Sequence, residues 1–248
     1  MLQNFESLVL IWLGIGFITF ITLLKIPAPY GKFSKTNWGP MIPSKLGWIV
    51  MEIISPLALL YFFLNGNIEK TPTNITFISL WTLHYFNRSV IYPLRQNNPA
   101  QMPLLIAVLA FLFNVMNGYI NGTYFGSIQE YSAEYMSNWN FIVGVCLFII
   151  GAYINIKSDN ILLSLRSKSG EYKIPEGFMF RYVSFPNYLG EILEWMAFAI
   201  MTWSIAGLSF MIWTMANLVP RAIKGHQWYH NKFESYPKNR KAIFPFII

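Results

Sequence analysis

The sequence predicts an all-α integral membrane protein with seven transmembrane helices. Of its 248 residues, 54% are hydrophobic and 18% aromatic, whereas only 12% are charged, about half the charged fraction of a soluble domain. The mean hydropathy is +0.40. Apolar runs also recur along the chain at the length of about 20 residues that a helix needs to cross ~30 Å of hydrocarbon. These observations indicate a multi-pass membrane protein.

The seven apolar runs predict the helices in order. They lie at about 5–25, 46–65, 73–93, 102–121, 139–157, 187–205 and 207–224. The first run lacks a basic leader and a small-residue cleavage site, so it is predicted as a membrane helix and not a signal peptide. Only Ser204-Ile205-Ala206-Gly207 separates the last two runs. No internal repeat or flexible linker is visible, so a single domain over 1–248 is expected.

The distribution of charge predicts the orientation of these helices. With seven spans, Lys70 is the one exception among 18 Lys and Arg residues, and the others fall on a single side. Four acidic residues lie on the opposite side: Glu6, Glu69, Glu130 and Glu134. By the positive-inside rule the N-terminus is outside and the C-terminus is cytoplasmic. An even number of spans would destroy this separation.

Several functional classes receive little support from the sequence. The net charge is +7, but no basic block alternates with aromatic residues on a polar surface, so nucleic-acid binding is not expected. The single Cys146 excludes an intrachain disulfide. No glycine-rich phosphate loop or nucleophile elbow is present. The three histidines, His84, His226 and His230, lack Cys or carboxylate partners at metal-ligand spacing, so no metal site is expected.

Carboxylates inside the apolar runs indicate a polar site. Asn187, Glu191 and Glu194 follow i, i+4, i+7 and share one helical face. A charged group at bilayer depth costs about 2.5–3.5 kcal/mol on insertion scales, so such groups face a protein interior or a wet cavity. Glu52 in the second run has no opposite charge in that run. It is either functional or a helix-end carboxylate that reaches the interface.

Polar side chains at the ends of other runs allow two interpretations each. Tyr85, Arg88, Tyr92 and Arg95 form one stripe, as interface anchors do. They also suit function, because a phenol donates to a carbonyl oxygen and guanidiniums bind phosphate. Asn155, Asp159 and Arg166 share a face if their helix continues, although a solvated helix end would look the same.

The combination of motifs resembles the steroid 5α-reductases over about residues 45–248. The motifs are Asn155-Ile156-Lys157-Ser158-Asp159, Tyr172-Lys173-Ile174-Pro175, Asn187-Tyr188-Leu189-Gly190-Glu191 and the tail from Phe233 to Phe246. The stretches Trp48-Ile49-Val50-Met51-Glu52 and His84-Tyr85-Phe86-Asn87-Arg88 are similar to the substrate-side motifs. The Asn-Tyr-x-Gly-Glu motif alone is shared with sterol reductases and isoprenylcysteine methyltransferases, whereas the combination is more specific.

This resemblance implies an enzyme that uses NADPH to reduce the 4,5 double bond of a 3-oxo-Δ4-steroid. Tyr85 would donate to the substrate 3-carbonyl, Glu52 would support the phenol, and Trp48 would contact the substrate. The substrate side would be formed mainly by helices one to four. The cofactor side would lie mainly in 150–248, with cytoplasmic loops as a cap. The implied cofactor residues are Asn155, Asp159, Arg166, Tyr172, Asn187, Glu191, Arg221, Tyr229, Arg88 and Arg95. Glu194 is expected to be structural.

Some positions depart from the family pattern, and other functions stay open. Met51 stands where the family has Gln, and Gly225 interrupts what is a run of His in the family. The stretch Asn97-Asn98-Pro99 stands where relatives carry Arg. Alternatives are a membrane reductase of another sterol, polyprenol or enoyl lipid, an isoprenylcysteine-type methyltransferase, or a small transporter or lipid-binding protein. We expect a monomer among membrane lipids. A bacterial member is expected, in the inner membrane; a eukaryotic one would lie in the endoplasmic reticulum.

Overall fold

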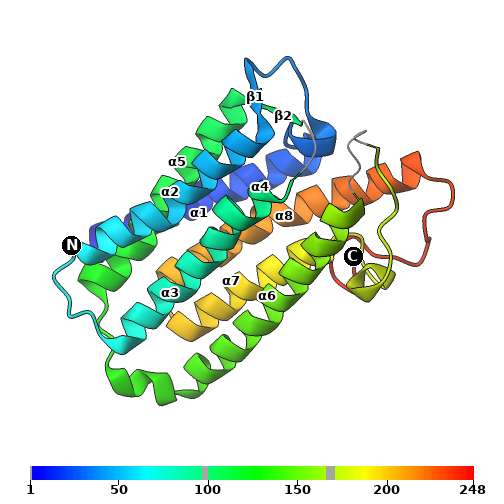
Figure 1. Ribbon diagram of the computed structural model, residues 1–248. Coiled ribbons are helices and arrows are strands. Elements are labelled where there is room, and N and C mark those ends of the chain that lie inside the picture. The colour runs from blue at the N-terminus through cyan, green and yellow to red at the C-terminus, as the bar shows by residue number, and fades with distance from the viewer. Residues whose placement is uncertain (1, 97–99, 166–170) are drawn as a thin grey trace. The chain divides into compact units, whose positions relative to one another are not determined.

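The computed structural model describes residues 2–96, 100–165 and 171–248, and these are predominantly helical (Figure 1). The chain divides into two compact units. Unit 1 comprises Met1–Phe5 and Pro29–Ile142, and unit 2 comprises Glu6–Ala28 and Val143–Ile248. The long helices α1 (Leu2–Lys25) and α6 (Trp139–Leu165) each contribute to both. The expectation of one domain stays a prediction.

Unit 1 is built on the packing of α2 (Ser44–Leu64) against α5 (Leu104–Thr123) (Figure 1). Gly118 and Gly122 make this contact close, because a Cβ on Gly118 would lie 2.6 Å from the Ala58 Cβ. The helix α3 (Pro72–Phe86) also packs on α2, and the Trp81 Nε1 donates to the Ser55 Oγ at 3.1 Å. Backbone contact between these helices therefore fixes the framework of unit 1.

Two short strands join the beginnings of α2 and α5. The strands β1 (Met41–Pro43) and β2 (Gln101–Pro103) are antiparallel, with Met41 opposite Pro103. Further short elements of unit 1 are the 3-10 turns Gly31–Phe33 and Ala133–Ser137 and the π-helical turn Tyr124–Ile128. Each strand of the small sheet therefore leads directly into one of the two helices, β1 into α2 and β2 into α5.

The predicted helix at 73–93 is interrupted. The α-helix α3 ends at Phe86, a π-helical turn covers Asn87–Ile91, and α4 (Tyr92–Leu94) follows. The Tyr92 N–H bonds to the Asn87 carbonyl, five residues back. Pro93 explains the change, because it has no N–H and its ring would clash with the carbonyl four residues earlier. The π-helical turn begins two residues after Tyr85, and π turns often lie at functional sites.

Unit 2 contains α6, α7 (Pro186–Thr202) and α8 (Ile205–Lys232), with a 3-10 turn at Phe178–Arg181. Glycines bring α6 and α7 into backbone contact, since a Cβ on Gly151 would lie 2.7 Å from the Gly190 carbonyl oxygen. The helix α1 joins α8, where the Trp213 Nε1 donates to the Trp12 carbonyl at 3.1 Å. In unit 2, α6 therefore packs on α7 and α1 packs on α8.

The C-terminal tail folds back onto the segment that begins α7. The Ser184 N–H donates to the Lys241 carbonyl at 2.8 Å, and the Lys241 N–H donates to the Tyr182 carbonyl at 2.9 Å. Beneath this pairing lies an apolar cluster that includes Phe185, Tyr229 and Ile243. The tail is thus part of the packed structure of unit 2, and it covers the residues that precede Asn187.

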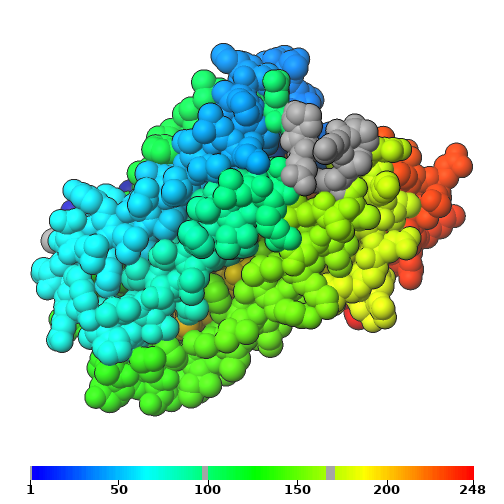
Figure 2. All heavy atoms as spheres, viewed as in Figure 1, coloured from blue at the N-terminus to red at the C-terminus, as the bar shows by residue number. Residues whose placement is uncertain are grey.

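Four helices in the described part of the chain are long and apolar enough to cross a membrane: Leu2–Lys25, Ser44–Leu64, Leu104–Ile128 and Trp139–Leu165. Exposed apolar side chains such as Ile149, Ile150 and Tyr153 lie on α6, whose outer surface is the green to yellow-green band in Figure 2. Helices also cover the other three predicted segments. The chain is a membrane protein, while the number of seven spans and their orientation stay predictions.

Candidate active site

The phenol of Tyr85 lies in a buried hydrogen-bond network of unit 1. Tyr85 is in the last turn of α3 and is buried. Its hydroxyl donates to the Asn114 Oδ1 on α5 at 3.3 Å, and the Asn114 Nδ2 donates to the Met51 carbonyl on α2 at 2.6 Å. The Tyr85 ring stacks on Trp81, with centroids 5.7 Å apart. Three helices therefore fix the position of this hydroxyl.

The other predicted substrate residues lie beside this network. Glu52 directly follows Met51 and is half-buried. Trp48, one turn earlier on α2, has the Arg88 guanidinium 5.1 Å from its ring centroid. Arg88 also lies 5.5 Å from the ring of Tyr92. The structure therefore brings Arg88, which the sequence placed with the cofactor phosphates, against a predicted substrate residue. Arg95 is exposed beyond the end of α4.

A second polar network lies where α6 meets α7 in unit 2. The Asn155 Nδ2 donates to the Asn187 carbonyl at 2.9 Å, and the Asn187 Nδ2 donates to the Asp159 Oδ1 at 3.0 Å. All three residues are buried. Within the described residues, the Asn187 Oδ1 has no hydrogen-bond partner. Burying an amide oxygen without a partner is costly, so this oxygen marks a place where a ligand donor fits.

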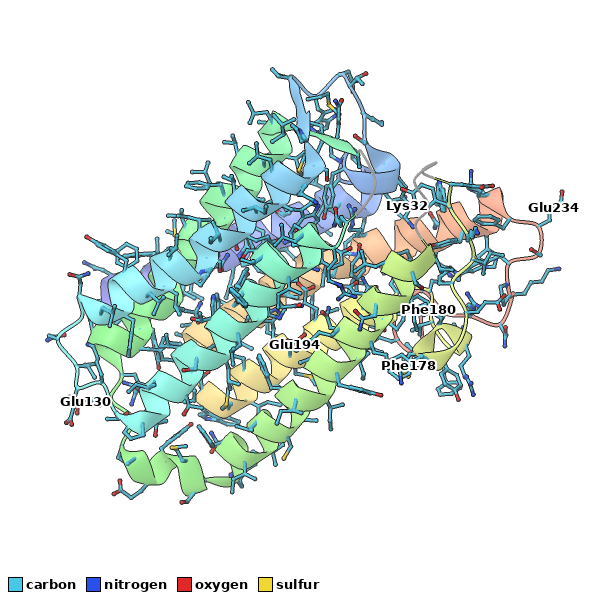
Figure 3. All side chains as sticks on the ribbon, viewed as in Figure 1. Lys32, Glu130, Phe178, Phe180, Glu194 and Glu234 are labelled. Carbon is cyan, nitrogen blue, oxygen red and sulfur yellow. The ribbon has the colours of Figure 1, made fainter. Side chains whose placement is uncertain are left out.

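Glu191 and Glu194 differ in their surroundings on α7. Glu191 lies one turn after Asn187 and is half-buried. Glu194 is 2% exposed and lies on α7 beside α6 (Figure 3). A Cβ on Gly151 of α6 would lie 2.9 Å from the Glu194 Cγ, so Glu194 packs against the neighbouring backbone. This packing agrees with the expected structural role of Glu194, and the contact of Glu191 with the cofactor stays a prediction.

The remaining predicted cofactor residues occupy different environments. The Arg221 Nε donates to the Tyr188 hydroxyl at 2.9 Å, and the Tyr188 ring stacks on Phe185. Tyr229 is buried in the apolar cluster and stacks on Tyr236. Tyr172 is exposed, with its ring edge-on to Trp228. Arg166 lies outside the described residues.

A hydrogen-bonded chain joins the tail to the N-terminal side of α7. The Tyr236 hydroxyl donates to the Ser184 Oγ at 2.7 Å, and this oxygen lies 2.6 Å from the His226 Nδ1. Burial, the largest cause, and electrostatic interactions with His230, Lys241 and Arg240 together lower the His226 pKa to about 4. The Arg240 Nη1 donates to the Pro175 carbonyl at 2.9 Å. His226 is therefore neutral at pH 7.

Sequence reasoning missed several of these partners. Asn114, Tyr188 and Ser184 form the contacts that hold Tyr85, Arg221 and His226, respectively. Asn114 carried a usable signal, because an amide inside an apolar run is costly and needs a partner. Tyr188 lies inside the motif from Asn187 to Glu191 and Ser184 shortly before it, but their partners are 33 and 42 residues away in sequence. Only the packing of the helices reveals such pairs.

Comparison with known proteins supports one family. Residues 100–248 match the family model described as 3-oxo-5-alpha-steroid 4-dehydrogenase. A steroid 5-alpha-reductase of Solanum lycopersicum is 43% identical over 98% of this chain and 96% of its own length. The 3-oxo-5-alpha-steroid 4-dehydrogenase 1 of Rattus norvegicus is 36% identical over 94% and 91%, respectively. The Homo sapiens protein of that description is 34% identical over 94% and 92%. These relatives are plant and mammalian proteins, so they do not support the expectation of a bacterial chain.

Proposed function

Because this chain belongs to the 3-oxo-5-alpha-steroid 4-dehydrogenase family, it is a membrane oxidoreductase, and we propose that it uses NADPH to reduce the 4,5 double bond of 3-oxo-Δ4-steroids. The observation that carries the finer proposal is the buried Tyr85 hydroxyl, which three helices hold in a fixed position. Its family position on the substrate side supports the same role.

The chemistry requires a hydrogen-bond donor at the 3-carbonyl. When bound, NADPH would supply the hydride that C5 receives, and the resulting enolate would take a proton at C4. The carbonyl oxygen gains negative charge as C5 is reduced, and the Tyr85 hydroxyl donates a hydrogen bond to it. A preorganised donor is most effective in an apolar site, where water does not compete. Glu52 supports the phenol from α2, and Trp48 offers the substrate an aromatic surface.

The polar residues of unit 2 fit a nicotinamide dinucleotide. The Asn155 and Asp159 side chains hold Asn187 in place, and its Oδ1 would accept from the carboxamide N–H of the cofactor. Glu191, one turn along the same helix, would accept from ribose hydroxyls. Guanidinium groups bind phosphate oxygens as forked donors, and Arg221 is held by Tyr188. Arg166, Arg88 and Arg95 are proposed for phosphates, and Tyr172 and Tyr229 for further contacts with the cofactor.

Substitution of Tyr85 by Phe tests the proposed function. Removing one donor at a developing oxyanion costs about 10²–10³ in kcat. We therefore expect Tyr85→Phe to lower the kcat for progesterone or testosterone by this factor. The NADPH dissociation constant should not change, because the hydroxyl acts on the steroid.

The matched control is Tyr61→Phe. Tyr61 lies on α2 with its side chain exposed, so loss of its hydroxyl should leave kcat at the wild-type value. Wild-type kcat in Tyr85→Phe would remove Tyr85 as the donor. Turnover of S-adenosylmethionine in place of NADPH oxidation would favour the methyltransferase alternative.

A further inference from the structure

We propose that Asn114 is a positioning residue that holds the Tyr85 hydroxyl in place for the reaction, an inference that rests on the proposed function. Asn114 lies on α5, is 3% exposed, and accepts from Tyr85. It belongs to no motif that the sequence suggested. Its hydrogen bond to the Met51 carbonyl is short and its hydrogen bond from Tyr85 is long, and the inference is based on this difference.

The nitrogen end of the Asn114 amide is firmly anchored. The Nδ2 donates to the Met51 carbonyl at 2.6 Å, which is short for an N–H···O bond. Because a backbone carbonyl only accepts, this bond requires the nitrogen on that side and the oxygen on the other. The Oδ1 therefore faces the Tyr85 hydroxyl as an acceptor, and the phenolic proton points toward a known atom before substrate arrives.

The oxygen end holds Tyr85 more loosely. The distance from the Tyr85 hydroxyl to the Asn114 Oδ1 is 3.3 Å, longer than the usual 2.7–2.8 Å of O–H···O bonds. A long bond costs little to exchange for a better acceptor, such as a ketone oxygen that gains negative charge. Long apo contacts are common for catalytic groups and change in the substrate complex. Asn114 thus orients the Tyr85 hydroxyl but binds it weakly enough for the substrate to replace Asn114 as the acceptor.

An uncharged acceptor suits this place better than a carboxylate. In the position of the Asn114 Oδ1, which the Tyr85 hydroxyl faces directly, a carboxylate oxygen would accept from that hydroxyl in a charge-assisted bond of roughly twice the strength and would compete with the substrate. It would also set an oxygen against the Met51 carbonyl. An apolar side chain would remove the acceptor that the Asn114 Oδ1 offers to the hydroxyl. The amide therefore provides both a donor for the Met51 carbonyl and an uncharged acceptor for the Tyr85 hydroxyl.

Substitution of Asn114 by Leu, which is similar in size, tests the inference in two backgrounds. In the wild-type background we expect kcat to fall about tenfold, the scale of one net hydrogen bond, with the steroid KM within about twofold and the NADPH dissociation constant unchanged. In the Tyr85→Phe background the same substitution should have no further effect, because Asn114 acts through the missing hydroxyl. Such a cycle isolates the coupling of the two residues.

Asn121→Leu is the matched control. Asn121 lies two turns later on α5, is fully buried, and donates to the Asn117 carbonyl in its own helix. Its Oδ1 has no partner in the described part of the chain, so an apolar replacement of similar shape should leave kcat near the wild-type value.

A second variant, Asn114→Asp, gives a pH readout that a purely structural role would not produce. The protonated carboxyl imitates the amide, because its O–H donates to the Met51 carbonyl and its other oxygen accepts from Tyr85. The ionised carboxylate instead holds the Tyr85 hydroxyl in a strong hydrogen bond, so that the hydroxyl does not turn to the substrate. The ratio of variant to wild-type kcat should therefore rise as pH falls. If Asn114→Leu does not fold, this pH profile tests whether Asn114 positions the Tyr85 hydroxyl.

The outcomes separate the two proposals. Absence of NADPH-dependent reduction of 3-oxo-Δ4-steroids by the wild-type protein would overturn the proposed function. Wild-type kcat in Tyr85→Phe would remove Tyr85 as the donor and overturn the inference with it. A lowered kcat in Tyr85→Phe, together with an equal loss from Asn114→Leu in both backgrounds, would overturn the inference alone. Unchanged kcat in Asn114→Leu, or a pH profile of Asn114→Asp parallel to the wild type, would also overturn it.

Discussion

Tyr85 and Asn187 are the residues on which the proposed chemistry depends, and a side chain from another helix holds each of them. Asn114 of α5 accepts from Tyr85 of α3, and Asp159 of α6 accepts from Asn187 of α7. Functional groups held by such contacts keep their geometry before ligand arrives, which lowers the cost of reaching the reactive arrangement. At this scale the sequence motifs included Tyr85, Asn187 and Asp159, but they did not include Asn114.

The Ser184, His226 and Tyr236 chain makes stability depend on pH. Burial and nearby cations hold the His226 pKa at about 4, against 6.5 for a free histidine. Between these values the unfolded chain binds a proton that the folded chain does not, so stability falls as pH is lowered from about 6.5 to about 4. His226→Gln should make the melting temperature less sensitive to pH in this window, because glutamine does not titrate.

Thermal unfolding of both proteins in detergent micelles measures this difference. The comparison is between the slopes of melting temperature against pH, not between the melting temperatures at one pH. Equal slopes in the two proteins would show that His226 does not titrate as proposed.

The elements of unit 2 depend on the close contact between α6 and α7. A Cβ on Gly190 would collide with the Asn155 backbone nitrogen and lie 2.7 Å from the Gly151 carbonyl oxygen. Backbone cannot move aside as a flexible side chain does. The contact is also what places Asn155 within 2.9 Å of the Asn187 carbonyl. The glycines are therefore required for the polar network and not only for packing.

Gly190→Ala should separate the two helices and weaken NADPH binding together with thermal stability. Overpacking of a tight core costs typically about 1–3 kcal/mol, so we expect a visibly lower melting temperature and at least a tenfold larger NADPH dissociation constant. Gly14→Ala is the control, because a Cβ there meets nothing within 4 Å. Wild-type NADPH binding in Gly190→Ala would show that this contact does not position the cofactor residues.

The lengths of the apolar runs predicted where the helices lie, but they did not predict the π-helical turn or the full extent of α8. All seven apolar runs coincide with helical segments. The π-helical turn after Phe86 was missed, although Pro93 was visible, because hydropathy does not report backbone hydrogen bonds. The helix α8 continues to Lys232, beyond the apolar run that ends near 224. Its last turns are stabilised by packing against the tail, which a hydropathy window does not detect.

For the whole molecule, the two units carry different parts of the proposed reaction. Trp48, Glu52 and Tyr85 belong to unit 1, and the network of Asn155, Asp159 and Asn187 belongs to unit 2. The family membership was predictable because its motifs combine over most of the chain. The hydrogen-bond partners were not predictable, because they depend on which helices pack together. The predicted number of seven spans rests on the seven apolar runs and on the charge distribution.

The most direct test of the proposed reaction follows the hydride itself. NADPH with deuterium on one or the other face of nicotinamide C4 is incubated with the protein and progesterone, and the product is examined by mass spectrometry and NMR. With one of the two labelled forms, we expect a 5α-reduced steroid with a single deuterium at C5 and one NADPH oxidised for each steroid reduced. A reduced product without deuterium at C5 from either form, or no NADPH oxidation with any 3-oxo-Δ4-steroid, would contradict the proposed reaction.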